Sequence, residues 1–200
     1  MGYTTDFSGK FKLNKPLTEA QAAYLRQFQQ TRRVKRDAAI TEKRPDPLRI
    51  AVGLPVGIEG GYFVGEGGDY GQGEEPPENY WEKYPNDLQK ARDEYERYYR
   101  ETLGILNRNA TPEGQPSLWN QWTPGKDEQD NDCIEWDGGE KFYDYVEWLK
   151  YLIDELLKPW GYVLNGEVNW EGESRDDMGI IICKDNVVTT KTAVITYEED

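Results

Sequence analysis

The sequence predicts an α+β fold, a ferredoxin-like sandwich in which two helices pack on one face of an antiparallel sheet. The first observation is the order of predicted elements: strand, helix, strand, strand, helix, strand and a final hairpin. The second is the three-and-four spacing of apolar residues over 142–156, and the third is the alternating strand that follows. We therefore expect one domain over residues 1–200, with an insertion at 66–114.

The N-terminal part predicts a strand followed by a helix. Apolar residues alternate over Phe7–Leu13, as in a half-buried strand. Thr18 and Gln21 then have the spacing of a capping box, so a helix is expected to begin there and to bury Phe28. This helix is expected to continue into the basic segment that starts at Arg32.

The second helix is predicted between two strands. Asp137 and Glu140 have the spacing of another capping box, and Pro159 marks the end of the helix. Apolar and polar residues then alternate over Tyr162–Trp170. The Asn165-Gly166 pair suits a hairpin turn, but the alternation runs through it, so we expect one strand.

Two hairpins complete the predicted sheet. Strands are expected at Leu118–Thr123 and Cys133–Trp136, joined by a loop at 124–132. The C-terminal hairpin joins Ile180–Cys183 to Val187–Tyr197 through a tight turn at Asp185-Asn186.

Composition excludes several classes of site. The 200 residues have a formal net charge of -14 and include no histidine. The commonest general base and the commonest transition-metal ligand are therefore missing, so zinc sites and Ser-His-Asp triads are not expected. No signal peptide and no apolar stretch of ~20 residues is evident, which predicts a cytoplasmic protein without a membrane segment. Cys133 and Cys183 are expected to be buried thiols, with a disulfide as the alternative.

A basic island stands out in this acidic chain, and it comprises Arg32, Arg33, Lys35 and Arg36. One interpretation is a solvated helix end whose cations complement the helix dipole. The other is a charged patch that contacts an acidic partner or a second copy of the protein.

The predicted insertion contains an amphipathic helix of about six turns from Asn86 onward. Its apolar stripe is rich in tyrosine, including Tyr95, Tyr98 and Tyr99. Such a stripe packs against its own chain or is offered to a partner.

A glycine-rich loop precedes this helix, with nine glycines among the 21 residues of Gly53–Gly73. Glycine-rich loops can bind phosphates, but neither a following Gly-Lys-Ser/Thr nor a strand feeding a G-x-G-x-x-G turn is present. A structural loop is the simpler interpretation, and nucleotide or metal binding is kept as an alternative.

Seven carboxylates lie between Asp127 and Glu140. Asp130 and Asp132 begin a calcium-loop pattern, but the required glycine is missing. Glu135 and Glu167, if on adjacent strands, would form a carboxylate pair of the glycosidase kind. A solvated hairpin loop with a helix cap explains the same residues. The many aromatic residues would suit RNA stacking, but the net charge opposes nucleic-acid binding.

Several short motifs resemble a group of short uncharacterised proteins of bacteria and their phages. The resemblance covers the chain outside roughly 66–114 and rests on Trp136-Asp137-Gly138, Tyr145-Val146-Glu147-Trp148-Leu149, Pro159-Trp160-Gly161-Tyr162 and Gly166-Glu167-Val168. It implies a bacterial or phage cytoplasmic setting, with no assigned activity.

The sequence therefore predicts a non-catalytic protein-protein interaction module without a cofactor. Its expected contacts are Tyr95, Tyr98 and Tyr99, with Arg32, Arg33, Lys35 and Arg36 as a separate patch. The partner is expected to be another protein, a basic host protein being one candidate, and self-association is a further option. An acidic mimic of DNA that inhibits a host defence enzyme is the main alternative.

Overall fold

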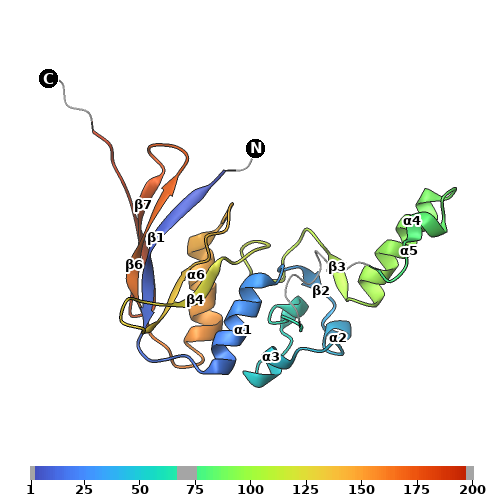
Figure 1. Cartoon of the computed structure of the whole chain (residues 1–200), viewed down its shortest axis with the longest axis horizontal. Coiled ribbons are helices and arrows are strands. Elements are labelled where there is room, and N and C mark those ends of the chain that lie inside the picture. Colours follow the sequence, from blue (N-terminus) through green and yellow to red (C-terminus); the bar gives the residue numbers. More distant parts are fainter. Residues whose placement is uncertain (1–2, 67–75, 197–200) are drawn as a thin grey trace. The chain divides into compact units, whose positions relative to one another are not determined.

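The computed structural model describes residues 3–66 and 76–196, and the chain divides into two compact units (Figure 1). Unit 1 combines residues 1–22 with 120–200, and unit 2 is the continuous segment 23–119. The expected insertion at 66–114 therefore falls inside a larger inserted unit.

Unit 1 is built on a six-stranded sheet with the order β4-β5-β1-β6-β7-β8, in which every paired neighbour is antiparallel. In this order the strands are β4 (Trp122–Lys126), β5 (Asp132–Trp136), β1 (Thr5–Leu13), β6 (Leu164–Gly172), β7 (Met178–Lys184) and β8 (Val187–Thr192). The predicted mixture of helices and antiparallel strands is confirmed.

One face of this sheet is covered by α6 (Tyr145–Leu152), which lies along the strands in Figure 1. Alternate residues of β1 and β6 supply the core, including the fully buried Phe11 and Val168. Trp148 and Leu149 of α6 are fully buried as well. The period-two pattern of the strands and the helical spacing of α6 thus meet in one apolar core.

The Asn165-Gly166 pair lies inside β6, as the alternation predicts, and Gly166 is needed there for close packing. Its φ is 149°, and a Cβ at this position would lie 2.5 Å from the carbonyl oxygen of Lys10. Gly9 on β1 has the reciprocal constraint, because its Cβ would lie 2.4 Å from the carbonyl oxygen of Glu167. The two glycines let β1 and β6 approach closely.

The predicted start of α6 is wrong. Asp137 accepts a hydrogen bond from Gly139 N at 2.7 Å in a local turn, and the helix begins at Tyr145. Gly138 has φ 83°, and Lys141 and Asp144 also have positive φ. This left-handed backbone is incompatible with a helix over 138–144.

The end of α6 widens into a π-helical turn, η2 (Ile153–Leu157), in which Lys158 N donates to Ile153 O at 2.8 Å. This one-residue widening allows Ile153, Leu156 and Leu157 all to be buried. Pro159 follows, so the predicted helix end is confirmed.

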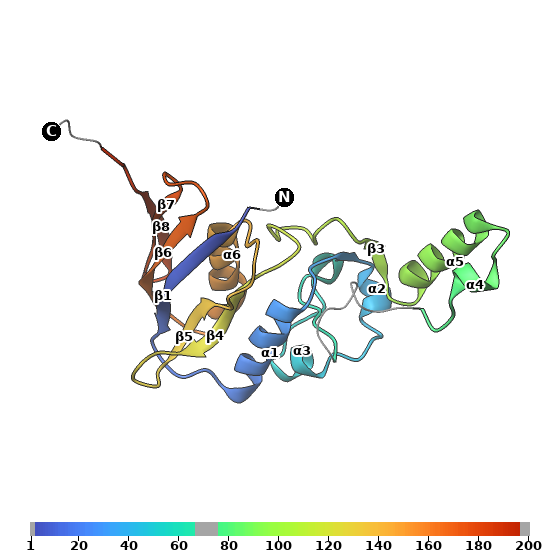
Figure 2. The ribbon, with the colours of Figure 1, turned by 45° about the horizontal axis from the view of Figure 1, so that its top comes forward.

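Unit 2 contains helices of different lengths (Figure 2) and a two-stranded sheet of β2 and β3. Its elements are most of α1 (Glu19–Gln30), β2 (Lys35–Arg36), α2 (Ala38–Thr41), α3 (Pro47–Ala51), a 3₁₀ turn η1 (Ile58–Gly60), α4 (Tyr80–Lys83), α5 (Leu88–Glu101) and β3 (Ile105–Asn107). The Thr18–Gln21 capping box is confirmed, since Gln21 N donates to Thr18 Oγ1 at 3.2 Å. However, α1 ends at Gln30, and the basic residues Lys35 and Arg36 form β2.

The helix of the insertion is shorter than predicted. It consists of α5, whose N-cap Asp87 accepts a bond from Lys90 N at 3.0 Å, and it ends at Glu101. Gly104, with φ 69°, follows the end of α5, and Leu106 belongs to β3. The C-terminal hairpin turn is confirmed, because Asp185 and Asn186 both have positive φ.

Within the described residues, no helix combines the length and apolar character needed to cross a membrane. Cys133 and Cys183 are both free and buried. Burial raises the pKa of each thiol to about 11, so neither is an activated nucleophile at neutral pH.

Candidate functional site

The basic island is not a continuous surface patch, because Arg33 and Arg36 are each only 2% exposed. Arg33 donates to Gly61 O at 2.8 Å, Phe63 O at 3.0 Å and Gln115 Oε1 at 3.2 Å. Its guanidinium lies 4.1 Å from the centre of the Phe28 ring. Arg36 donates to Leu103 O at 3.2 Å and lies 4.8 Å from the centre of the Phe63 ring. The expectation that both arginines contact a partner is therefore corrected, because both guanidinium groups bond inside unit 2.

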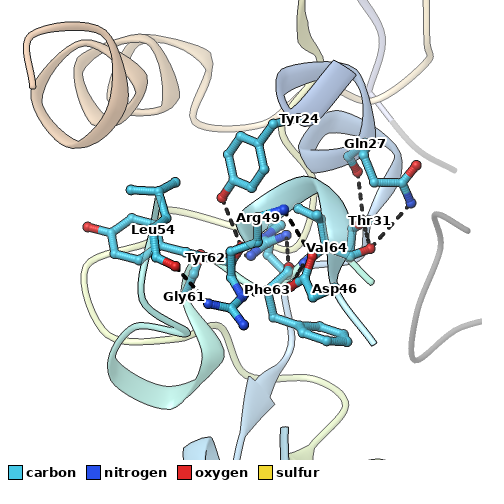
Figure 3. A network of polar contacts seen from close by, with 11 residues as sticks. Tyr24, Gln27, Thr31, Asp46, Arg49, Leu54, Gly61, Tyr62, Phe63 and Val64 are labelled. Carbon is cyan, nitrogen blue, oxygen red and sulfur yellow. Dashed lines mark hydrogen bonds and ion pairs between the residues drawn. The ribbon is translucent and has the colours of Figure 1, made fainter. Parts of the chain in front are cut away.

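The polar network that fixes this part of unit 2 is drawn in Figure 3. Asp46 and Arg49 form a buried ion pair of 3.0 Å between Oδ2 and Nε, and Arg49 also donates to Leu54 O at 2.7 Å. Asp46 accepts a further bond from Val64 N at 3.1 Å. The pair thus has additional partners for both charges, as a buried ion pair requires.

Side chains of α1 and of Thr31, just after it, also bond to this loop. Tyr24 donates to Tyr62 O at 2.8 Å, and Gln27 and Thr31 both donate to Val64 O at 3.3 Å (Figure 3). Five carbonyl groups of 54–64, those of Leu54, Gly61, Tyr62, Phe63 and Val64, therefore accept hydrogen bonds from side chains of unit 2. In its described part, the glycine-rich loop is a structural element. Residues 67–73 of the predicted loop lie outside the described residues.

Arg32 and Lys35 are the half-buried members of the island. Arg32 donates through Nε and Nη2 to Arg108 O at 3.3 and 3.2 Å. Lys35 forms an ion pair with Glu59. Both side chains thus have local partners in unit 2, and Arg32 is linked to Tyr95 through Arg108.

The tyrosines of α5 have different environments. Tyr99 is buried in a small core with Val34, Leu103 and Ile105, so it is corrected from a partner contact to a packing residue. Tyr95 and Tyr98 are partly buried against this core. Tyr95 is held by a hydrogen bond from Arg108 Nη1 at 3.1 Å.

A groove of about 570 Å³ lies beside Tyr95, on the hairpin formed by α4 and α5. Its walls include Trp81, Leu88, Arg92, Tyr95, Glu96 and Arg108. Trp81 is 47% exposed and Leu88 is 67% exposed, although both are large apolar side chains. The Trp81 and Tyr95 rings have centroids 6.1 Å apart. We call this surface the aromatic groove.

The sequence did not identify Trp81 or Arg108 as part of a site, and it placed Leu88 on the buried stripe. Only the position of Trp81 in the sequence could have indicated its role, since it lies on a short proline-flanked segment directly before the amphipathic helix. Arg108, in the turn after β3, is distant in sequence from Trp81, so only the fold brings the two into one groove.

The acidic hairpin between β4 and β5 is largely neutralised by lysines. Its ion pairs are Lys12–Asp127 at 2.9 Å, Lys126–Asp132 at 2.8 Å and Lys10–Glu135 at 2.7 Å. The hydrogen bond from Lys12, with others from Asn131 and Gln129, holds the pKa of Asp127 well below its ordinary value. This hairpin is an ion-paired turn.

The proposed carboxylate pair of Glu135 and Glu167 is wrong. β1 lies between β5 and β6, so the two residues are not on adjacent strands. Lys10 on β1 is opposite Glu167 and ion-paired with Glu135. Among residues 3–66 and 76–196, no group of three or more Cys, Asp or Glu side chains is placed to hold a metal ion.

Comparison with known proteins identifies no relative. No family model matches the chain, and no curated protein or solved structure does. The interpretation of the site therefore rests on its own geometry.

Proposed function

We propose that this protein is a non-catalytic interaction module that binds another protein through the aromatic groove. The observation that carries the proposal is the exposure of Trp81 and Leu88 next to the half-buried Tyr95. Aromatic side chains in a pocket are typical anchors of protein interfaces, because they bury a large area with few rotatable bonds.

The chemistry of the groove favours a partner segment with an apolar side chain next to a carboxylate. Arg92 and Arg108 line it together with one acidic residue, Glu96. Arg92 and Glu96 form an exposed ion pair of 3.3 Å, which contributes little to stability. Arg92 can therefore exchange Glu96 for a carboxylate of the partner at little cost. Arg108 lies over the Tyr99 ring at 4.4 Å, so its position is fixed by packing.

This proposal accounts for the described residues better than the two alternatives. DNA mimicry needs carboxylates presented as an unpaired array, whereas the densest acidic hairpin is paired with Lys10, Lys12 and Lys126. Nucleotide binding by the glycine-rich loop needs outward-facing backbone donors, whereas Val64 N donates to Asp46. The setting implied by the resemblance, a bacterial or phage cytoplasm, is part of the proposal.

We keep the ferredoxin-like interpretation for the strands of unit 1 with α6, because most of α1, the other expected sheet-packing helix, belongs to unit 2. Four of its strands follow the order β4-β5-β1-β6, with β5 and β1 central. This is the order produced by two interleaved strand-helix-strand units, and it supports the interpretation.

The test is capture from bacterial lysate with the tagged full chain, washed at low and then high salt. We expect a salt-resistant partner that is lost with a Trp81→Ala, Leu88→Ala double variant. Ile50→Ala is the matched control, because Ile50 is an equally exposed apolar residue of unit 2 outside the groove. Partners captured equally by the double variant, or a DNA-binding protein eluted by salt, would contradict the proposal.

A further inference from the structure

The two edges of the six-stranded sheet differ in their backbone groups. At the β4 edge, Asp127 N donates to Asn131 O and Asp137 N donates to Gln121 O, so odd-numbered residues of β4 bond to β5. The backbone groups of Trp122, Pro124 and Lys126 therefore point away from β5, toward the edge of the sheet. The side chain of Asn120 bonds to both Trp122 N and Trp122 O, and Pro124 has no N–H. This edge is closed to another strand.

The β8 edge has no such protection in the described chain. β8 is paired only with β7. Ala193 N donates to Met178 O at 2.8 Å in the same register, so odd-numbered residues bond to β7. The N–H and C=O groups of Val188, Thr190 and Thr192 consequently face outward. The strand contains no proline and one charged residue, Lys191.

Exposed apolar residues accompany this open edge. Val187 is 64% exposed and Val194 is 86% exposed, and Ile195 is exposed as well. The β7–β8 hairpin carries Lys184 and Lys191 against Asp185, although the whole chain has a charge of -14. Two copies can therefore approach through this hairpin with less repulsion than through the acidic remainder of the chain.

We propose that β8 pairs with β8 of a second copy, antiparallel about a two-fold axis at Thr190. In this register Val188 lies opposite Thr192 of the other copy, Thr189 opposite Lys191, and Val187 opposite Ala193, with Ile195 diagonal to it. A shift of two residues that sets Thr190 opposite Thr192 would place Lys191 opposite itself, which like-charge repulsion disfavours. The same strand of each copy forms the interface, so it is self-complementary, as a two-fold dimer requires.

Analytical ultracentrifugation of the full chain tests this dimer over a range of micromolar concentrations. The small interface of one strand pair predicts a concentration-dependent rise in mass from 23.2 kDa toward twice that value. Thr190→Pro removes the outward N–H without removing a bond to β7, so the rise should be lost. Thr190→Val keeps the outward N–H, so the rise in mass should remain. Thr190→Lys sets like charges opposite each other at the axis and should abolish it.

Amide hydrogen exchange locates the interface independently of any variant. With rising concentration the amides of Val188, Thr190 and Thr192 should become protected, whereas those of Thr189 and Lys191 are protected already. A mass of 23.2 kDa at every concentration overturns the proposal. So does a dimer without added protection at these three amides, or one that persists in folded Thr190→Lys.

Discussion

Arg33 shows at the scale of one residue why the basic island is structural. A buried guanidinium is tolerated because its fork reaches several acceptors at once, here two carbonyls and the Gln115 amide oxygen. A lysine has the same charge, but all of its N–H donors are on one nitrogen, so it cannot reach acceptors as far apart as these. The identity of the residue, beyond its charge, is thus required by the loop at 61–63.

Arg33→Lys should lower the free energy of unfolding by about 3 kcal/mol, because buried acceptors lose their donors. Urea unfolding at neutral pH measures the change. Arg32→Lys is the control, and because Arg32 is only half-buried it should cost less than ~1 kcal/mol. Equal effects of the two substitutions would show that burial of Arg33 is not what matters.

Asp127 links stability to pH. Its pKa in the folded protein lies below its ordinary value, so protons bind the unfolded chain more readily than the folded one. The stabilisation is complete above the unfolded pKa of ~3.9 and is lost as pH falls from there toward the folded pKa.

We expect Asp127→Asn to reduce the free energy of unfolding at pH 7 and to change it less at pH 2.5. Chemical denaturation at both values tests this. Glu128→Gln is the control, since Glu128 is an exposed neighbour in the same turn. A loss of stability that is the same at both pH values would contradict the assignment of the pH effect to Asp127.

At the scale of elements, the sequence predicted those whose signal is local or periodic. The Thr18–Gln21 box, the Asp185-Asn186 turn and the alternation in β6 all act over a few residues, and all three are confirmed. The start of α6 and the end of α1 were wrong for a different reason. The Asp137 side chain accepts a hydrogen bond within a turn and does not cap a helix. Arg33 and Arg36 donate to carbonyl groups of distant segments, which ends α1 before them.

The candidate site was predicted only in part. The tyrosine-rich helix was recognised, but how much of its length is covered was not, because Leu88 and Tyr99 lie on the same face at opposite ends of α5 and look equivalent in a periodic stripe. Only the core formed with Val34 and Ile105 decides that Tyr99 is buried, and only α4 brings Trp81 beside Tyr95. Such contacts between distant segments leave no periodic signal.

Gly166→Ala should destabilise the protein by roughly 2–4 kcal/mol, because β6 would have to move away from β1. The carbonyl oxygen of Lys10 occupies the space of the new methyl group. Gly138→Ala is the matched control: Gly138 also has positive φ but has no atom within 4 Å of the added carbon. It should cost only about 1 kcal/mol. Thermal unfolding compares them, and similar losses would contradict the close approach.

At the scale of the whole molecule, the two units have separate cores. Leu149 is fully buried in unit 1, and Leu103 is fully buried in unit 2. Unit 2 is one continuous segment between residues 22 and 120, so it can unfold locally while the six-stranded sheet of unit 1 stays intact. This requires that the contacts within unit 2 are weaker than those within unit 1.

Leu149→Ala should therefore raise hydrogen exchange in β1, β6 and α6, and Leu103→Ala should raise it in the described parts of 23–119. Each substitution should cost about 2–5 kcal/mol within its own unit. Exchange measured by mass spectrometry resolves the segments. An equal rise across both units for either variant would show that they unfold together.

The π-helical turn at Ile153–Leu157 also determines which changes in chain length unit 1 can accept. Tyr162, a few residues further on, donates to Pro16 O at 3.1 Å and to Gln21 Oε1 at 2.7 Å, at the start of α1. Deleting one residue from the turn would restore a regular helix but rotate the following segment about the helix axis and withdraw this hydroxyl. Single-residue insertions and deletions in this helix should thus be tolerated less well than its ordinary apolar sequence suggests.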